Sequence, residues 1–204
     1  MLHQKIVVFI IGKRNFLVNK FKNFRFLFFP NFKKIMGKEV LFASKFPKTQ
    51  QKTFFTGNGN IFIGKDCRFG FKTGGFNYKG SIELQARYEH SKIIIGDNVA
   101  INNNVFICAA NKIEIGDNTL FGQNISLMDY EAHGINPTKR RQVGTIGEIK
   151  IGKNAWIGNN VIILKNSIIG ENSIIAAGAV VSGEFPSNVI IGGVPAKIIK
   201  KIDV

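Results

Sequence analysis

The chain has 204 residues and a hydrophobic fraction of 45%, which excludes general disorder and fits one principal domain with an appendage. Its two cysteines, at positions 67 and 108, cannot build a disulfide framework and are compatible with a reducing compartment. No run is long and apolar enough to span a bilayer, and the early VVFII run lacks a small-residue cleavage signature downstream, so we expect a cytoplasmic protein.

The net charge of +15 is concentrated in the first part of the chain. Residues 1–58 hold 12 of the 28 Lys and Arg but only one acid, Glu39, and residues 1–55 hold 12 of the 19 Phe. The basic character therefore belongs mostly to this segment. In it, Leu17, Phe21, Phe24 and Phe28 fit one face of a helix, which we expect Pro30 to end.

Two interpretations of this basic, aromatic segment remain open. An amphipathic helix of this kind can lie in a membrane interface and be drawn to anionic lipid, which would place the protein peripherally on the inner face of the cell membrane through residues 1–55. The same helix can instead cap the open end of a β-structure and hide strand edges. We expect no nucleic-acid partner, because no recognised nucleic-acid module is present.

A six-residue pattern begins near Ile63, with Cys67 at a small inward position. The segment 70–92 is irregular, and the pattern does not fix its register. The pattern returns at Ile95, slips by two residues, and resumes at Ile115.

The pattern is most regular between residues 151 and 181. There a large aliphatic residue recurs every six positions, and a small residue follows four positions after each of the first five. The aliphatic residues are Ile151, Ile157, Ile163, Ile169, Ile175 and Val181, and the small ones are Ala155, Val161, Ser167, Ser173 and Ala179.

Short strands explain this period, because side chains two apart share a face of a strand and the remaining residues can turn a corner. The corner positions hold Gly and Asn, which tolerate a positive φ in tight turns. They are Gly152, Gly158, Gly170, Asn154, Asn160, Asn166 and Asn172. Equal strands and equal corners predict an all-β fold, a parallel β-helix in which three hexads close one triangular coil.

The expected organisation has three parts. Residues 1–58 form the basic Phe-rich segment, residues 59–191 form the β-helix, and residues 192–204 form a turn and a short helix. The repeat is interrupted by a polar passage at 128–150. An insertion in so regular a scaffold is where a solenoid usually carries its function.

This insertion contains His133, with Asp129 and Glu131 within four residues of it. A histidine near an acid can act as a general base at neutral pH, because a carboxylate can fix its tautomer. From the spacing alone, a solvated loop histidine is the alternative. The other two, His3 and His90, have the sequence context of ordinary surface residues.

Three stretches in this order resemble the left-handed β-helix acyltransferases with hexapeptide repeats, and in particular those that acetylate sugars and surface polysaccharides in bacteria. The stretches are DYEAHGINP followed by KRR, NAWIGNNVIILKNSIIGENSIIAAGAVV, and IIGGVPAKIIKKI, and the resemblance covers roughly residues 60–200. It places the family's catalytic histidine on His133. Asn166 stands where the family often has Gly, and the long Phe-rich segment is an addition to the family pattern.

The resemblance also implies that acetyl-CoA lies along the β-helix between two subunits of a homotrimer. The matching candidates for contact with acetyl-CoA are Trp156, Ala177, Gly178, Pro195 and Lys197. Small residues would leave backbone amides accessible to the pantetheine arm, and a lysine could meet a CoA phosphate. Each of these residues also has an ordinary use, in covering the coil, tight packing or solvation.

The mechanism implied is direct transfer in a ternary complex, with His133 removing the proton of an acceptor hydroxyl. Asp129 or Glu131 could orient the imidazole, and Arg140 or Arg141 could bind acceptor or cofactor, with a solvated charge run as the alternative for both arginines. Covalent catalysis through Cys67 is not expected, because it occupies an inward position. For Cys108, no His or acid is close in sequence to activate it.

Several other functions remain as alternatives. An N-acyltransferase for an amino sugar would use the same scaffold, and so would a non-catalytic binding module. A zinc-dependent carbonic anhydrase of the γ type needs three histidine ligands, whereas the repeat region has only His90 and His133, so no metal is expected.

Overall fold

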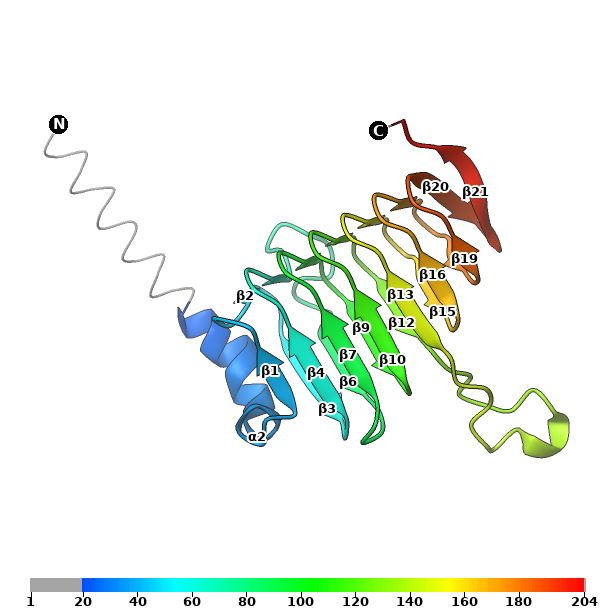
Figure 1. The fold of residues 1–204 in the computed structure, drawn as a ribbon. Coiled ribbons are helices and arrows are strands. Elements are labelled where there is room, and N and C mark those ends of the chain that lie inside the picture. Colours follow the sequence, from blue (N-terminus) through cyan, green and yellow to red (C-terminus); the bar gives the residue numbers. More distant parts are fainter. Residues whose placement is uncertain (1–19, 204) are drawn as a thin grey trace, which may run out of the picture.

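The computed structural model describes residues 20–203. Its main body is a triangular solenoid, a left-handed parallel β-helix whose coils stack along one axis (Figure 1). Each side of the solenoid is one parallel sheet, and successive strands of the chain pass from sheet to sheet. The predicted fold class is confirmed.

Each sheet takes one strand from each coil that it spans, and sheet B also includes the antiparallel strand β21. Sheet A contains β1 (Val40–Phe42), β4 (Asn60–Ile63), β7 (Lys92–Ile95), β10 (Lys112–Ile115), β13 (Glu148–Ile151), β16 (Ser167–Ile169) and β19 (Glu184–Phe185). Sheet B contains β2 (Lys48–Thr49), β5 (Arg68–Phe69), β8 (Ala100–Ile101), β11 (Leu120–Phe121), β14 (Trp156–Ile157), β17 (Ile174–Ile175), β20 (Val189–Gly193) and β21 (Ala196–Lys201). Sheet C contains β3 (Thr53–Gly57), β6 (Ile82–Ala86), β9 (Val105–Ala109), β12 (Ile125–Met128), β15 (Ile162–Leu164) and β18 (Val180–Val181).

The aliphatic residue of each hexad points into the solenoid and stacks on its equivalent in the next coil. In sheet A, for example, Ile115 pairs with Ile95 on one side and Ile151 on the other, and all three are buried. The small positions are buried too, as expected: Cys67 and Ala155 are each 1% exposed. The six-residue period of aliphatic side chains therefore produces a narrow aliphatic core along the axis of the solenoid.

Asparagines turn the corners as predicted, and they also bond to one another. Nine Asn corner residues have φ between 56° and 62°, Asn166 among them with φ 62°. Side-chain amides of successive coils form ladders, such as Asn104 to Asn124 and Asn124 to Asn160, each at 2.8 Å. A corner Asn thus adopts a left-handed backbone and links neighbouring coils.

The corner glycines have a different role from the one predicted. Gly152, Gly158 and Gly170 are not among the described residues with positive φ. Instead, they leave room for the next coil: a Cβ at Gly158 would lie 2.6 Å from the amide nitrogen of Ala177. Backbone proximity, rather than turn conformation, explains these three glycines.

A helical segment covers the first coil. It runs from helical residues 20–23 through the π-helix η1 (Phe24–Phe28) and the 3₁₀ helix η2 (Phe29–Asn31) into α2 (Phe32–Met36). Pro30 therefore does not end the helical path, because it occupies an early position in a 3₁₀ turn, where its missing N–H is not needed.

The predicted face of this helix is only partly right. Leu17 lies outside the described residues. Leu27 is the side chain that enters the core, with 0% exposure, whereas Phe21 and Phe24 are 64% and 53% exposed.

Two asparagines of this segment close strand edges. Asn31, 3% exposed, donates to the carbonyl of Thr53 at 2.7 Å and accepts from the amide of Phe55 at 2.6 Å. It thus provides partners for one carbonyl and one amide of edge strand β3. Asn23 accepts from the amide of Thr49 in edge strand β2 at 3.0 Å. These contacts favour the capping interpretation, because edge groups of β2 and β3 find partners in the helical segment.

Both ends of the β-helix differ from the expected boundaries. The coils begin at β1 rather than at residue 59, because strands β1 to β3 complete the first turn. The expected short C-terminal helix is wrong: residues 196–201 form β21, which folds back antiparallel onto β20 after a tight turn. Within residues 20–203, no helix is long and apolar enough to cross a membrane.

Candidate active site

The interruption of the repeat forms a loop, residues 129–147, that projects from the corner between β12 and β13 (Figure 1). Its two arms bond to each other near the solenoid. The amide of Gly147 donates to the carbonyl of Asp129 at 2.7 Å, and Glu131 and Thr145 pair at 2.9 Å through the amide of Glu131. The arms support a tip that contains His133.

Asp129 anchors the base of this loop. Its carboxylate, 0% exposed, accepts three backbone amides of the preceding coil: Ala110 at 2.6 Å, Asn111 at 3.0 Å and Lys112 at 2.7 Å. Burial raises the pKa of Asp129, while the three amides act in the opposite direction by favouring the carboxylate. The residue fixes where the loop leaves the solenoid.

Glu131 holds the two arms of the loop to the body. Its carboxylate accepts from the amide of Thr145 at 3.1 Å and lies 3.3 Å from the ammonium group of Lys165. The hydrogen bond from Thr145 lowers the pKa of Glu131, and Lys165 contributes in the same direction.

His133 is held by the backbone of the loop. Its Nδ1 lies 2.8 Å from the carbonyl oxygen of Arg140, on the opposite arm. A carbonyl oxygen can only accept, so this contact puts a proton on Nδ1, and in the neutral ring the lone pair is then on Nε2. The ring is exposed, and the amide of the next residue, Gly134, bonds to the carbonyl of Gln142 at 2.8 Å. The arrangement orients the imidazole through Nδ1 at the tip of the loop.

The carboxylates do not orient this ring. Among the described residues, neither Asp129 nor Glu131 makes a hydrogen bond or ion pair with His133, because each is committed to backbone amides at the base of the loop. The expectation that one of them fixes the tautomer is wrong for this conformation. Nearness in sequence did not reveal that the partner would be a main-chain oxygen seven residues away.

Arg140 and Arg141 lie beside His133 on the loop, after the short 3₁₀ helix η3 (Pro137–Lys139). Both side chains are exposed. The guanidinium Nη1 of Arg140 lies 3.5 Å from the carbonyl of Gly134, so it bends back across the tip. The loop therefore presents a cationic surface next to the imidazole.

The residues predicted to contact acetyl-CoA are separated from the loop by sheet C. They lie on sheet B and at its corner with sheet C. Trp156, 54% exposed, projects from β14 and pairs in register with Leu120 and Ile174. Ala177 and Gly178 turn the corner between β17 and β18. Gly178 has φ 75°, and a Cβ there would meet nothing within 4 Å.

Pro195 and Lys197 are one coil further along. The peptide bond between Val194 and Pro195 is cis, and Lys197 pairs with Gly192 in the β20 and β21 hairpin. Ala176 donates its amide to the carbonyl of Ile191 at 2.8 Å, which places the hairpin directly over the Ala177 corner. Trp156, Ala177, Gly178, Pro195 and Lys197 thus occupy successive coils along sheet B and its corner with sheet C.

A single chain does not bring the two sets together. The loop with His133 leaves the corner between sheets C and A, while Ala177 and Gly178 turn the corner between sheets B and C. Sheet C lies between these corners. The candidate base and the candidate acetyl-CoA residues are therefore on two different edges of the prism.

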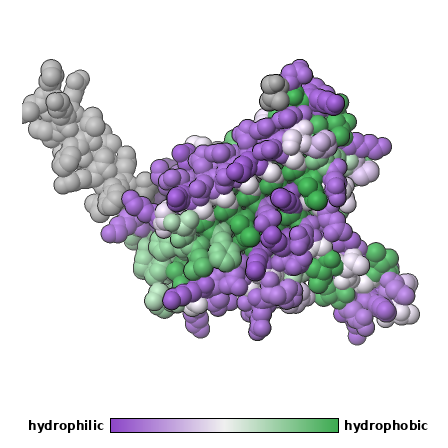
Figure 2. Space-filling model, in the orientation of Figure 1, coloured by the Kyte–Doolittle hydropathy of each residue, from purple (hydrophilic) through white to green (hydrophobic). Residues whose placement is uncertain are grey.

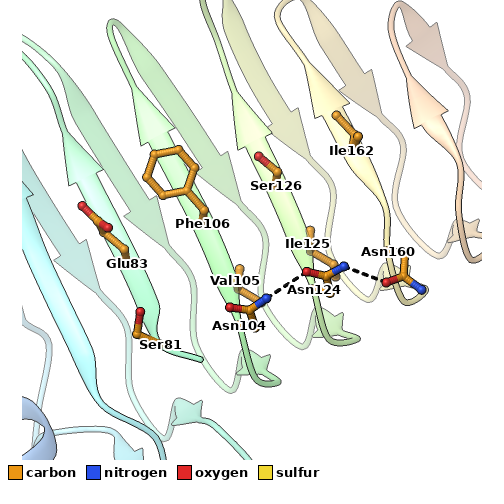
Figure 3. Close-up of a pocket in the computed structure, with 10 residues that line it drawn as sticks. All are labelled: Ser81, Glu83, Asn104, Val105, Phe106, Asn124, Ile125, Ser126, Asn160 and Ile162. Carbon is orange, nitrogen blue, oxygen red and sulfur yellow. Dashed lines mark hydrogen bonds between the residues drawn. The ribbon is translucent and has the colours of Figure 1, made fainter. Parts of the chain in front are cut away.

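The outer face of sheet C has a shallow cavity of about 480 Å³ (Figure 3). Outward side chains of successive strands line it, including Glu83, Phe106, Ser126 and Ile162. Glu83 accepts from the hydroxyl of Thr56 at 2.8 Å. Sequence reasoning missed these residues, although the two-residue alternation of residues 82–86 and 105–109 would have pointed them outward.

Both cysteines are buried. Burial raises the pKa of Cys67 to about 11, and it also raises the pKa of Cys108. Cys108 lies 2.9 Å from the side-chain oxygen of Gln85 and 3.6 Å from the hydroxyl of Tyr130, which covers it. Neither thiol is activated as a nucleophile. No group of three or more His, Cys, Asp or Glu that could hold a metal ion occurs in residues 20–203.

Comparison with protein families finds one match. The model described as bacterial transferase hexapeptide (six repeats) matches residues 148–183. A protein of Escherichia coli, provisionally named a lipopolysaccharide biosynthesis O-acetyltransferase, is 33% identical over 138 residues, which are 62% of this chain and 70% of that protein. The galactoside O-acetyltransferase of Escherichia coli is 37% identical over 118 residues, 55% of this chain and 56% of that protein.

A relative from Dictyostelium discoideum, provisionally named an acetyltransferase, is 44% identical over 114 residues, and the chain spans 59% of its length. Among solved structures, a galactoside acetyltransferase in complex with coenzyme A aligns with a TM-score of 0.51 and 23% identity, over 81% of this chain and 66% of that chain. An N-acyltransferase from Bacillus cereus aligns with a TM-score of 0.63 and 19% identity, over 85% and 89%. At these identities the structures confirm the fold.

Proposed function

The chain belongs to the bacterial hexapeptide-repeat transferases, and from this membership we propose that it transfers an acetyl group from acetyl-CoA to a hydroxyl of a sugar, in a glycan, a surface polysaccharide or a precursor of one. Relatives named as O-acetyltransferases support the reaction class. The single observation that carries the proposal is the imidazole of His133, held at the tip of an inserted loop by the contact between its Nδ1 and the carbonyl of Arg140.

The residues on sheet B and its corner suit the donor. Acetyl-CoA supplies the acetyl group as a thioester. Trp156, Ala177, Gly178, Pro195 and Lys197 would hold it along the solenoid. The open space over Gly178 leaves its backbone accessible to the amide-bearing pantetheine arm, and exposed Lys197 can meet a phosphate as a point charge.

The site requires more than one copy of the chain. Because the loop and the Ala177 corner lie on different edges of the prism, the loop of one subunit would reach the donor residues of its neighbour. A closed homotrimer places every loop beside such a corner, and each of its three sites is then complete.

The proton transfer follows from the tautomer. His133 Nε2 accepts the proton of the acceptor hydroxyl as that oxygen forms its bond to the acetyl carbon, and the same imidazolium then returns the proton to the leaving sulfur. The Arg140 carbonyl keeps the ring in place and stabilises the imidazolium through Nδ1–H. Arg140 and Arg141 offer positive charge to the acceptor or to the donor phosphates.

The test is an acetyl-CoA acceptor screen with free sugars, nucleotide-linked sugars, amino sugars and polysaccharides, with products read by mass. We expect acetyl ester products, and we expect His133→Ala to lower kcat by roughly 10²- to 10⁴-fold, the usual contribution of a general base. The matched control is His90→Ala, because His90 is also exposed and stacks on Tyr88 with ring centroids 5.8 Å apart.

Oligomeric state is measured in the same samples by light scattering, so that loss of activity is separated from loss of assembly. Full activity in a folded His133→Ala protein would exclude this residue as the base. Amide products on amino sugars alone would favour N-acylation. No transfer to any acceptor, with acetyl-CoA not hydrolysed, would favour a binding module.

A further inference from the structure

The helical segment that caps the first coil leaves a row of large apolar side chains uncovered. Figure 2 shows apolar residues gathered over this end of the molecule. The exposed fractions are 64% for Phe21, 53% for Phe24, 72% for Phe29, 52% for Phe32 and 62% for Met36. A contiguous exposed patch of this kind marks an interaction surface.

The cap itself does not need these side chains. Leu27 and Asn31 are the buried residues of the segment, and they contact the coil together with Asn23 and Ile35. The ring of Phe28, half-buried, lies 5.7 Å from that of Phe24 and 5.6 Å from that of Phe32. The outer rings therefore pack on one another and present their free faces to solvent.

A groove of about 1040 Å³ adjoins this row, between the helical segment and the first two coils. Its apolar lining includes the rings of Phe24, Phe28 and Phe46. Five cations and one carboxylate also line it: Lys20, Lys45, Lys48, Lys65, Arg68 and Asp66.

These cations have no partner of opposite charge in the described part of the chain. None of the four ion pairs there involves Lys45, Lys48, Lys65 or Arg68, and all four of these side chains are exposed. The surface thus combines free apolar rings with uncompensated positive charge.

We propose that this end of the β-helix docks on an anionic phospholipid bilayer. Phe29 and Phe32 enter the headgroup region, where aromatic rings can leave water, and the cations of the groove meet lipid phosphates. A second copy of the chain would meet these cations with the same cations, which disfavours self-association through this surface. The inference does not depend on the reaction that the protein catalyses.

The test is flotation of the full-length protein with vesicles. Wild type is expected to float with phosphatidylcholine vesicles containing phosphatidylglycerol, to float less with phosphatidylcholine alone, and to be released by salt. Phe29→Ser/Phe32→Ser and, separately, Lys45→Gln/Lys48→Gln/Lys65→Gln/Arg68→Gln should each lower the partition coefficient by roughly tenfold or more, since each cation near an anionic surface contributes about fivefold.

Matched controls remove similar groups elsewhere. Tyr78→Ser/Ile168→Ser removes two exposed large side chains, and Lys92→Gln/Lys150→Gln/Lys200→Gln/Lys201→Gln removes four exposed charges. Both should bind vesicles like wild type. Equal losses in controls and test variants, unchanged binding of the test variants, or no flotation of wild type would each overturn the proposal. Loss of binding to single-stranded RNA in the test variants, with vesicle binding intact, would identify a nucleic acid instead.

Discussion

The Nδ1 atom of His133 lies 2.8 Å from the carbonyl oxygen of Arg140. The contact joins the two arms of the projecting loop and is made to the main chain, so it depends on the loop's conformation rather than on a particular side chain. Orientation of the imidazole is consequently tied to the stability of the loop base, where Asp129 and Glu131 act.

Glu131→Gln should change kcat by less than about threefold, because Glu131 does not contact the imidazole and the amide oxygen of Gln can still accept from Thr145. Steady-state kinetics on the acceptor found by the screen would check this, with His133→Ala as the reference. A loss in Glu131→Gln as large as that in His133→Ala would restore the carboxylate to a role in orienting the ring.

Asp129→Ala should lower the free energy of unfolding by about 3 kcal/mol, because three backbone amides lose their buried acceptor. Asp129→Asn keeps one acceptor oxygen and should lose less. Urea denaturation followed by circular dichroism measures both. The control is Asp203→Ala, an exposed carboxylate at the end of the described chain. Equal stability of Asp129→Ala and the control would contradict the anchoring role.

Asn31→Ala should destabilise the protein by about 2 to 3 kcal/mol and increase its aggregation, because the carbonyl of Thr53 and the amide of Phe55 lose their partner on an edge strand. Thermal unfolding and light scattering report the two effects. Asn58→Ala, at an exposed position in the same coil, is the control and should behave like wild type.

Gly158→Ala should destabilise the fold by more than about 1 kcal/mol, because the added Cβ would lie 2.6 Å from the amide nitrogen of Ala177 and the coils must separate. Gly178→Ala has open space at the same corner one coil later, and it is opposed only by its φ of 75°. A chemical denaturation series should therefore rank Gly158→Ala as the less stable of the two, and the reverse order would refute the explanation by close backbone approach.

Cys67 and Cys108 should resist alkylation by iodoacetamide at pH 8 in the native protein. With the pKa of Cys67 raised to about 11, the thiolate fraction at this pH is on the order of 0.1%, and it increases only as the pH rises towards the pKa. Intact-mass measurement would show no addition within an hour, and two additions after unfolding. Rapid native labelling of either thiol would mean that its coil opens.

The six-residue period was sufficient to predict the fold, because the residues of each hexad are enough to specify one short strand and one corner. Ile151 and Ile157 needed no long-range information to point inward. The left-handed corners could be predicted for the same reason, since Asn118 or Asn154 adopts its φ locally.

Errors arose where the deciding partner was distant in the sequence. Gly158 depends on Ala177 in the next coil, and the course of the chain past Pro30 depends on edge strand β3, which Asn31 caps. By composition, the C-terminal segment IIKKI suits a helix. It forms a strand instead because it pairs with the edge of β20. In each case a contact with a residue distant in the sequence overrode the local preference.

The residues of the candidate site could be named from the sequence, but the hydrogen bonds that hold them could not. The insertion drew attention to His133 because it breaks the period, and a loop of this kind is conspicuous in any regular solenoid. The group that fixes the imidazole is the main-chain carbonyl of Arg140. Every residue has such a carbonyl, so the residue type at this position could not predict this role. Sequence patterns report side chains far better than main-chain contacts.

The two ends of the solenoid are closed by different means. Asn23 and Asn31 occupy the edge groups at the first coil, and at the last coil β21 covers the edge of sheet B and presents Lys200 and Lys201 to solvent. Stacked parallel strands with free ends would add further chains and lengthen into a fibre. At the last coil β21 pairs with β20 and blocks the addition of a further chain to sheet B, whereas β19 and β18 remain the edge strands of sheets A and C. Lengthening into a fibre through sheet B is therefore prevented by the hairpin that ends the described chain.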